Sequence, residues 1–362
     1  MTGPELPRTM LAVVCHGPYD YRLEESPVPQ AEPGEVVIQV QACGICASDI
    51  KCYTGAPLFW GDDHRVPYVD APVIAGHEFT GQVVALGEES AEKYGLQIGD
   101  IAIAEQIVPC WNCRYCKDGK YWLCQVHYIF GFQKVVQGGM AEYMKFPGNS
   151  LIHKVPNRIS PAQAAVVEPL ACSIHAVQRG EIEFGDVVVI AGAGTLGLGM
   201  IGAARLKNPG KLIAVDLIDR RLEAAKNLGA DLGLNPTQTD VVEQVLEMTD
   251  GYGCDVYIEA TGHPSAVEQG LRMIRKAGTF VEFSVMREPV TVDWTIIGDT
   301  KELNIHGAHL GPYAYPLAID YINRGLIDVN QIVTHQLPLE EYLDAFEMVQ
   351  QGTNSIKVQL VP

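Results

Sequence analysis

A thiolate, an imidazole and carboxylates occur in the first half of the chain at positions that could hold a catalytic metal. Cys46 is followed 31 residues later by the adjacent pair His77 and Glu78. Sulfur, nitrogen and oxygen donors from separate loops are typical of an open zinc site, in which three protein ligands leave one position for water or substrate. Cys43 could replace Cys46 as the thiolate. Buried cysteines and hydrogen-bonded core histidines are common, so a purely structural interpretation also stays open.

Glu168 is a further candidate ligand of this metal. It lies in the apolar segment formed by residues 166–170. An acid is costly to bury unless a charge or a metal pairs with it, which indicates a role for this carboxylate at a site. The alternative is that Glu168 is an exposed acid at a helix end. A helix start is predicted nearby, because Ser160, Pro161 and Gln163 form a capping box with proline at the first helical position.

Four closely spaced cysteines form the most specific local motif. Cys110, Cys113 and Cys116 follow one another at intervals of three, and seven residues separate Cys116 from Cys124. This spacing predicts a closed, tetrahedral zinc site that stabilises a lobe and takes no part in the chemistry. An iron–sulfur cluster is the alternative. In bacterial ferredoxin runs, however, the fourth cysteine follows after three residues and precedes proline, whereas Cys124 precedes Gln125.

Residues 186–216 have the order of strand, tight turn, helix and strand that binds a dinucleotide. An apolar, β-branched run at residues 187–191 leads into a complete G-x-G-x-x-G, and the second strand ends at Asp216. The glycines permit a tight turn, the approach of a pyrophosphate and close helix–strand packing, while the helix N-terminus offers free N–H groups. A glycine-rich turn without a ligand is the alternative.

Asp216 favours NAD over NADP as the coenzyme. Its carboxylate would accept hydrogen bonds from the ribose hydroxyls and repel a 2′-phosphate. Arg220 and Arg221 follow closely enough to leave NADP open. The candidate coenzyme-binding residues are Gly192, Gly194, Thr195, Leu196, Gly197, Asp216 and Arg221.

Composition and charge exclude several classes of partner. The chain has 362 residues, which suits two domains, and its net charge of −18 disfavours nucleic acid and anionic membranes. The uncharged residues 187–204 contain five glycines and are fewer than the ~20 apolar residues that a membrane span needs. Residues 10–15 are too short for the core of a signal peptide, so we expect a cytoplasmic protein. Its ten cysteines then indicate metal binding or packing rather than disulfides.

The order of predicted elements indicates an α/β protein with two domains. Residues 10–40 read as strands and turns of a β-rich domain, whereas strands and helices alternate from residue 187 to about 285, which predicts a doubly wound parallel sheet. The final strand, near residues 356–361, needs a sheet to join and is expected to return to the first domain. We therefore expect a catalytic domain at residues 1–168 and 310–362 and a nucleotide-binding domain at residues 169–309.

With these segments in place, the chain resembles the zinc-containing medium-chain alcohol and polyol dehydrogenases along its whole length. The motifs that carry the resemblance occur in that family's order: CGICASD, GHEFTG, the four-cysteine segment, VEPLACSIHA and GAGTLG. The resemblance implies a GroES-like catalytic domain and a Rossmann domain. It implies that Cys46, His77, Glu78 and Glu168 surround a catalytic zinc, with either glutamate as a direct ligand or holding a water. It also implies NAD, two zinc ions per subunit, a homodimer or homotetramer, and a role in cytosolic carbohydrate metabolism.

Details of the motifs narrow the substrate. The glutamate in VEPLA is similar to that of the polyol and threonine dehydrogenase branch. Lys51 stands where many members have a relay histidine, and Leu310-Gly311 stands where sorbitol dehydrogenases have Arg-Tyr. The insertion GAPLFWGDDHRVPYVDAP and the turn GAHLGPYAYP resemble dehydrogenases of four-carbon polyols. We therefore expect oxidation of erythritol or threitol to erythrulose, with threonine 3-dehydrogenase, butanediol dehydrogenase and sorbitol or xylitol dehydrogenase activities as alternatives.

The candidate residues suggest a route for oxidising an alcohol. Zinc is expected to favour ionisation of the hydroxyl, as it lowers the pKa of bound water from ~15.7 to ~7. Ser48 could pass the proton to the coenzyme ribose, or a water held by Glu168 could accept it. Hydride would then transfer to NAD in the cleft between the domains. The rivals are a zinc-free reductase, which should lack Cys46, His77 and the four cysteines together, and a zinc-ribbon module for nucleic acid, which the acidic charge disfavours.

Overall fold

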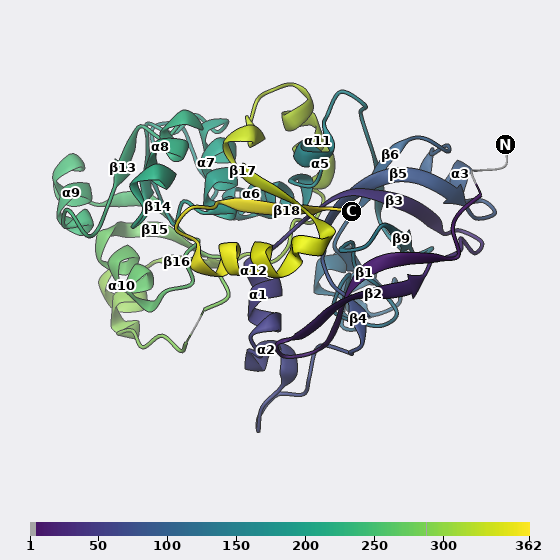
Figure 1. Cartoon of the computed structure of the whole chain (residues 1–362). Helices are drawn as coiled ribbons and strands as arrows, with labels where there is room; N and C mark the ends of the chain where they lie inside the picture. Colours follow the sequence, from purple (N-terminus) through teal and green to yellow (C-terminus); the bar gives the residue numbers. More distant parts are fainter. Residues whose placement is uncertain (1–4, 287) are drawn as a thin grey trace. The chain divides into compact units, whose positions relative to one another are not determined.

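The computed structural model describes residues 5–286 and 288–362, and the chain forms two compact units (Figure 1). Unit 1 comprises Met1–Glu168 and Val333–Pro362, and unit 2 comprises Pro169–Ile332. Residues 310–332 therefore lie in unit 2, although the sequence assigned them to the catalytic domain. The reason is packing, because helix α11 (Tyr315–Asn323) buries apolar side chains there and Ile327 lies against Gly202, at which an added Cβ would come within 2.9 Å of it.

A seven-stranded sheet is the centre of unit 1. Its strand order is β10-β6-β5-β3-β18-β17, and β9 also pairs with β3. The strands are β3 (Val36–Gly44), β5 (Glu78–Leu86), β6 (Ile101–Ala104), β9 (Tyr143–Phe146), β10 (Ile152–Val155), β17 (Val333–Pro338) and β18 (Lys357–Val361). Because β18 pairs with β3, the expected return of the last strand to the first sheet is confirmed.

Shorter elements complete unit 1. A three-stranded sheet and a two-stranded ladder contain β1 (Thr9–Gly17), β2 (Asp20–Pro27), β4 (Val73–Ile74), β7 (Ile107–Val108) and β8 (Tyr128–Ile129). The helices are α1 (Ala47–Tyr53), α2 (Pro57–Trp60), α3 (Ser90–Tyr94), α4 (Arg114–Lys117), α5 (Pro161–Ala164) and α12 (Tyr342–Gln351), with single 3₁₀ turns at Tyr121–Leu123 and Leu339–Glu341.

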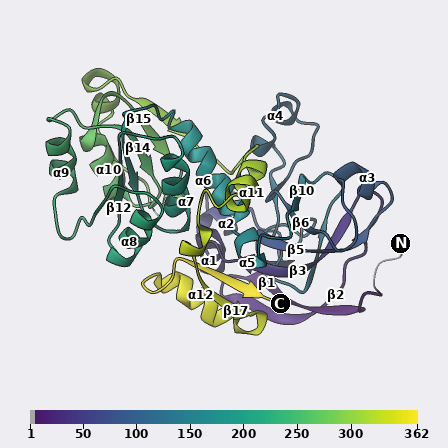
Figure 2. The same cartoon turned by 90° about the horizontal axis from the view of Figure 1, so that it is seen from above.

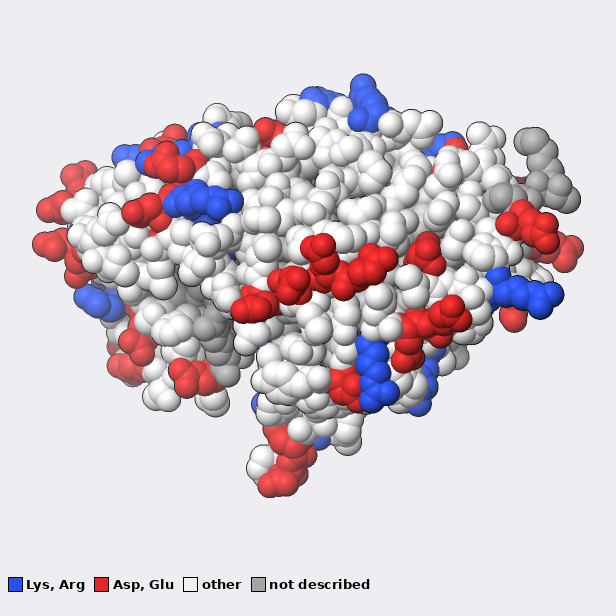
Figure 3. All heavy atoms as spheres, in the orientation of Figure 1, with Lys and Arg blue, Asp and Glu red and all other residues white. Residues whose placement is uncertain are grey.

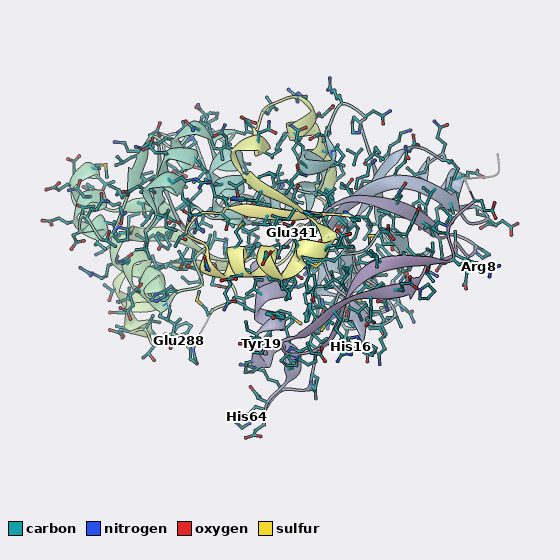
Figure 4. All side chains as sticks on the ribbon, viewed as in Figure 1. Arg8, His16, Tyr19, His64, Glu288 and Glu341 are labelled. Carbon is teal, nitrogen blue, oxygen red and sulfur yellow. The ribbon has the colours of Figure 1, made fainter. Side chains whose placement is uncertain are left out.

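Helix α12 covers the C-terminal strands of unit 1 with one apolar face. Tyr342, Ala345 and Phe346 are buried, and the helix packs beside β17 and β18. The opposite face carries a row of exposed acids, which begins before the helix and continues along it: Glu340, Glu341, Asp344 and Glu347. Figure 3 shows this row in red, and Figure 4 labels Glu341 at one end of the helix. Apolar and acidic residues alternate with the period of a helix, so one face of α12 packs on the strands and the other carries part of the chain's negative charge.

Unit 2 contains a six-stranded, entirely parallel sheet, which confirms the doubly wound prediction. Its order is β13-β12-β11-β14-β15-β16. The strands are β11 (Val187–Ala191), β12 (Lys211–Val215), β13 (Leu232–Leu234), β14 (Cys254–Glu259), β15 (Ile274–Glu282) and β16 (Asn304–Gly307). The crossover helices are α7 (Thr195–Arg205), α8 (Asp219–Asn227), α9 (Val241–Met248) and α10 (Pro264–Met273).

Helices cover both faces of this sheet (Figure 2). On one face, apolar side chains of α9 and α10 pack with the strands into a single core, to which Val189, Ile213, Val245 and Leu271 contribute. Helix α7 follows β11 directly, so the glycine-rich turn lies at the carboxyl end of a central strand. None of the helices in the part of the chain that the structure describes combines the length and apolarity needed to cross a bilayer.

Candidate active site and metal centres

Cys46, His77 and Glu78 come together in unit 1. Each offers one ligand atom, and these three atoms lie within 4.8 Å of one another. Cys46 immediately precedes α1, and its backbone N–H donates to Asp49 Oδ2 at 2.8 Å. This bond fixes the start of α1 and the thiol that precedes it. A thiolate, an imidazole and a carboxylate at this spacing fit an open zinc site with three protein ligands.

His77 is buried and held between two polar side chains. Its Nδ1 lies 3.4 Å from Asp49 Oδ1, and its Nε2 lies 3.5 Å from Ser48 Oγ. Phe132 packs beside the ring, with 5.5 Å between ring centroids. Burial would lower the pKa of His77, but Asp49 and Cys46 raise it well above its ordinary value. A carboxylate behind one ring nitrogen is the usual way to orient a metal-binding histidine, and this arrangement would let Nε2 act as the ligand atom.

The Glu78 carboxylate is only 1% exposed and has a buried cation as its partner. Lys357 Nζ, on a residue that is 3% exposed, donates to Glu78 Oε1 at 2.8 Å and to Oε2 at 2.5 Å. The same ammonium donates to the carbonyl of Ile45 at 2.9 Å. Burial would lower the pKa of Lys357, but Glu78, Cys46 and Glu168 raise it above the ordinary value. Lys357 is therefore a charged partner within the acidic site.

Glu168 is buried in α6 (Val167–Arg179) but lies outside the three-ligand group of the described residues. The capping box predicted at Ser160 is present and starts α5, which precedes α6. Gln106 Nε2 donates to Glu168 Oε1 at 2.5 Å. The alternative, that Glu168 is an exposed acid at a helix end, is thus wrong. Its carboxylate accepts from a neutral amide and also raises the pKa of the Lys357 ammonium.

Cys43 differs from Cys46 in its surroundings. Its Sγ faces the backbone, donating to the Gly44 carbonyl at 3.8 Å, and it does not belong to the metal-binding group. Burial raises the pKa of the Cys43 thiol well above its usual value, which disfavours the thiolate that a metal needs. The geometry therefore favours Cys46. His64, in the loop between α2 and β4, is exposed at the tip of that loop (Figure 4).

Three residues at this site carried no sequence prediction: Asp49, Gln106 and Lys357. Asp49 had a local signal, because it stands three residues after Cys46, where an acid can bond to the backbone N–H that precedes a helix. Gln106 and Lys357 reach their partners across 62 and 279 positions of the chain. No local spacing could have indicated those two contacts.

The four-cysteine segment forms a second compact group. The sulfur atoms of Cys110, Cys113, Cys116 and Cys124 lie within 4.8 Å of one another, and none of the ten cysteines, all of which lie in the described part of the chain, forms a disulfide. The Cys113 and Cys116 sulfurs are 3.6 Å apart. Two thiolates bound tetrahedrally at ~2.3 Å lie about 3.8 Å apart, so the residues fit a zinc ion.

Backbone N–H groups favour the thiolate form of Cys113 in this group. Cys113 N and Asn112 N point to Cys110 Sγ, and Gln125 N points to Cys113 Sγ at 3.5 Å. Such donors, first that of Gln125, lower the pKa of Cys113 to about 6. With four thiols and no open position, the group suits a structural role.

The three glycines of the G-x-G-x-x-G turn in unit 2, which are Gly192, Gly194 and Gly197, are required for different reasons. Gly192 has φ +96°, and a Cβ on Gly197 would lie 1.7 Å from the Gly192 carbonyl oxygen, so the fold itself excludes side chains at both. A Cβ on Gly194 would meet nothing within 4 Å. Gly194 is also the N-cap of α7 and has no capping side chain. Open space beside an uncapped helix N-terminus fits the pyrophosphate of a dinucleotide.

Asp216 follows β12 and lies against this turn. Its Oδ2 accepts from Ala193 N at 2.7 Å, and its Oδ1 accepts from Ile218 N at 2.9 Å. Arg221 lies 3.8 Å from the same carboxylate. Thr195 and Leu196 form the first turn of α7, where the Leu196 carbonyl accepts from Ser173 Oγ at 2.9 Å. The structure thus places these candidate coenzyme-binding residues around one turn.

The chain is similar to known dehydrogenases over nearly its whole length. Residues 32–157 match the alcohol dehydrogenase GroES-like domain, and residues 195–324 match the zinc-binding dehydrogenases. The erythritol/L-threitol dehydrogenase of Mycolicibacterium smegmatis is 51% identical over 99% of each chain. Among solved structures, 2R,3R-butanediol dehydrogenase from Bacillus subtilis gives a TM-score of 0.86 at 31% identity, covering 98% of this chain and 99% of that one. An Escherichia coli CFT073 alcohol dehydrogenase in complex with NADH gives 0.86 at 28% identity, covering 98% and 100%.

Proposed function

This chain belongs to the zinc-containing medium-chain alcohol dehydrogenase family, and we propose that it oxidises a secondary alcohol of erythritol or threitol to erythrulose with NAD as hydride acceptor. The observation that carries the proposal is the group of Cys46, His77 and Glu78, whose donor types fit an open catalytic zinc site. The four-carbon substrate is inferred from the relative that is 51% identical.

The metal-binding residues would activate the alcohol. When bound, zinc supplies a Lewis acid that favours the ionised hydroxyl, and NAD supplies the hydride acceptor. Cys46 and His77 would hold the metal, with Asp49 behind His77 so that Nε2 stays available. Glu78, or Glu168 directly or through a water, would complete the set.

Proton release is assigned to Ser48. Its hydroxyl lies 3.5 Å from His77 Nε2, the ring atom that would bind the metal. A hydroxyl can accept one hydrogen bond and donate another, so Ser48 can relay the proton toward the coenzyme ribose. A Ser48→Ala variant should lower kcat without loss of zinc from this centre.

Coenzyme binding is assigned to the glycine-rich turn and Asp216. The N-terminus of α7, which no side chain caps, suits the pyrophosphate, and the Asp216 carboxylate disfavours a 2′-phosphate. We propose NAD, two zinc ions per subunit and a homodimer or homotetramer in the cytoplasm. Purified protein should carry two zinc ions per chain and Cys113→Ser one. The latter should also lose roughly 4 kcal/mol or more of stability, because closed zinc sites contribute folding free energy.

A substrate panel tests the assignment most directly. Erythritol, threitol, sorbitol, xylitol, threonine and butanediol would each be followed by NADH absorbance, and then again with NADP. We expect the highest kcat/KM for one of the two tetritols, with NADP lower than NAD by roughly tenfold or more. A higher kcat/KM for threonine or butanediol would overturn the substrate. Full turnover by protein devoid of zinc would overturn the mechanism.

A further inference from the structure

A buried ammonium group lies directly on one of the candidate metal ligands. Lys357 opens the last strand of the chain, and its Nζ donates to both oxygens of Glu78. Its third bond goes to the Ile45 carbonyl, next to Cys46. All three protons of the ammonium are thus used within the site, and Lys357 is 3% exposed.

The Glu78 carboxylate has little freedom to leave this position. Gly44 is its cross-strand neighbour on β3, and a Cβ at Gly44 would lie 2.1 Å from Glu78 Oε2. The absence of a side chain at Gly44 therefore makes room for the carboxylate. On the other side of Gly44, strand β18 pairs through Gln359 and brings Lys357 into reach. Glu78 thus lies in the space that Gly44 leaves open and is bonded there to Lys357.

Two cations that bind one carboxylate repel each other, so each lowers the affinity of the carboxylate for the other. A metal at Cys46 and His77 would share Glu78 with the Lys357 ammonium. The repulsion between the metal and the ammonium is weakly screened, because Glu78 and Lys357 are both buried. A lysine that served only to pin β18 to the sheet would instead have no effect on metal affinity. These two roles make different predictions for the same substitution.

We propose that Lys357 is a positioning residue of the metal centre, which holds Glu78 in place and makes this carboxylate a weaker ligand for a metal at Cys46 and His77. The inference rests on the proposed metal site but not on the identity of the substrate. It adds the last strand of the chain to the active site, through a residue that does not touch the reacting atoms.

The test is zinc affinity at this centre, measured on the full chain by competition with a chromophoric chelator while the four-cysteine site stays loaded. Lys357→Met removes the charge at similar length, and we expect it to bind zinc at least tenfold more tightly. Lys357→Arg keeps the charge and should stay near wild type. Lys145→Met, which removes the lysine of another Lys–Glu pair in unit 1, is the matched control and should leave affinity unchanged.

Glu78→Gln is a second measurement, which holds even if Lys357→Met folds poorly. It leaves the ammonium uncompensated beside the metal, so zinc affinity should fall at least tenfold, and adding Lys357→Met should recover most of that loss. Cobalt-substituted protein should show a changed visible spectrum in Lys357→Met but not in Lys145→Met. Unchanged or weaker zinc binding by Lys357→Met, or no recovery in the double variant, would overturn the proposal. Equal zinc content in wild type and Cys46→Ser would instead overturn the metal site itself.

Discussion

Unit 2 gathers its coenzyme-binding candidates from neighbouring parts of the chain, whereas unit 1 gathers its metal-binding candidates from distant ones. In unit 2, Ala193 N and the Asp216 carboxylate that it contacts are 23 positions apart and follow adjacent parallel strands. In unit 1, Lys357 and Glu78 are 279 positions apart and meet because β18 joins the sheet beside β3. Backbone regularity thus builds one candidate site, and side-chain packing builds the other.

The consequence is that the two sites should fail in different ways. A helix N-terminus and a strand end persist as long as unit 2 is folded, so single side-chain changes there should alter coenzyme affinity by modest factors. A site made of converging side chains loses its function when one donor is lost, even if the sheet that carries it stays intact.

Cys46→Ser should have the largest effect. Removing the thiolate should release zinc from this centre and lower kcat/KM by roughly 10³-fold or more, since Lewis-acid stabilisation supplies several kcal/mol and each 1.36 kcal/mol is a factor of ten. Metal analysis together with NADH production would measure both effects. Cys43→Ser, at a buried cysteine outside the group, is the control. Retention of zinc and full turnover in Cys46→Ser would contradict a catalytic metal site that includes Cys46.

Gln106→Leu should have the next largest effect on activity. The substitution removes the donor that contacts Glu168 Oε1 at 2.5 Å but keeps a side chain of similar size. Loss of a group that orients a metal-site carboxylate typically costs 10- to 100-fold, so we expect kcat to fall by roughly that factor. The control is Gln82→Leu, at a glutamine of β5 that donates to the Gly99 carbonyl instead. Equal kcat values for the two variants would mean that Glu168 needs no orienting partner.

The same contrast explains which features the sequence could predict. The predictions of the parallel sheet and of the family were confirmed. They were possible because the hydrophobic periodicity, the turn residues and the glycines that carry them lie close together in the chain. The alternation of strands and helices did not define each boundary: α10 ends at Met273, since Ile274 adopts extended backbone at the start of β15 and is buried there. Lys357 and Gln106 could not be predicted, because their roles depend on which distant strands pair. The roles of Glu78 and Glu168 remain predictions that the variants above test.

Gly194→Ala and Gly197→Ala should separate coenzyme binding from folding in unit 2. A methyl group at Gly194 meets no protein atom, so stability should change by less than about 0.5 kcal/mol while the KM for NAD rises roughly tenfold. A methyl group at Gly197 would clash with the Gly192 carbonyl and should cost about 3 kcal/mol or more. Gly298→Ala, also in open space, is the control for both measurements. An unchanged KM in Gly194→Ala would show that the open space beside α7 does not hold the coenzyme.

Glu282→Gln should have the smallest effect of these variants. It tests whether Glu282, which like Asp216 lies at the end of a strand of unit 2, also takes part in coenzyme binding. Glu282 ends β15 opposite Glu259 of β14, and its Oε1 has no hydrogen-bond partner among the described residues. Burial, and then Glu259, raises the pKa of Glu282 to about 7. The unfolded carboxyl group titrates near 4.3, so the stability that Glu282 contributes is complete below that pH and is lost as the pH rises through about 7.

Glutamine mimics the protonated carboxyl group at every pH and does not incur this loss. The Tm of Glu282→Gln relative to wild type should therefore rise between pH 5 and pH 8.5, by only about 2 °C because Glu282 is partly exposed and its charge is screened. The KM for NAD should stay unchanged, in contrast to Gly194→Ala. The control is Glu302→Gln, at an exposed acid of the same unit, whose Tm difference should not vary with pH. A Tm difference for Glu282→Gln that is constant across this range would mean that Glu282 ionises without cost, and a raised KM would instead assign this acid to the coenzyme site.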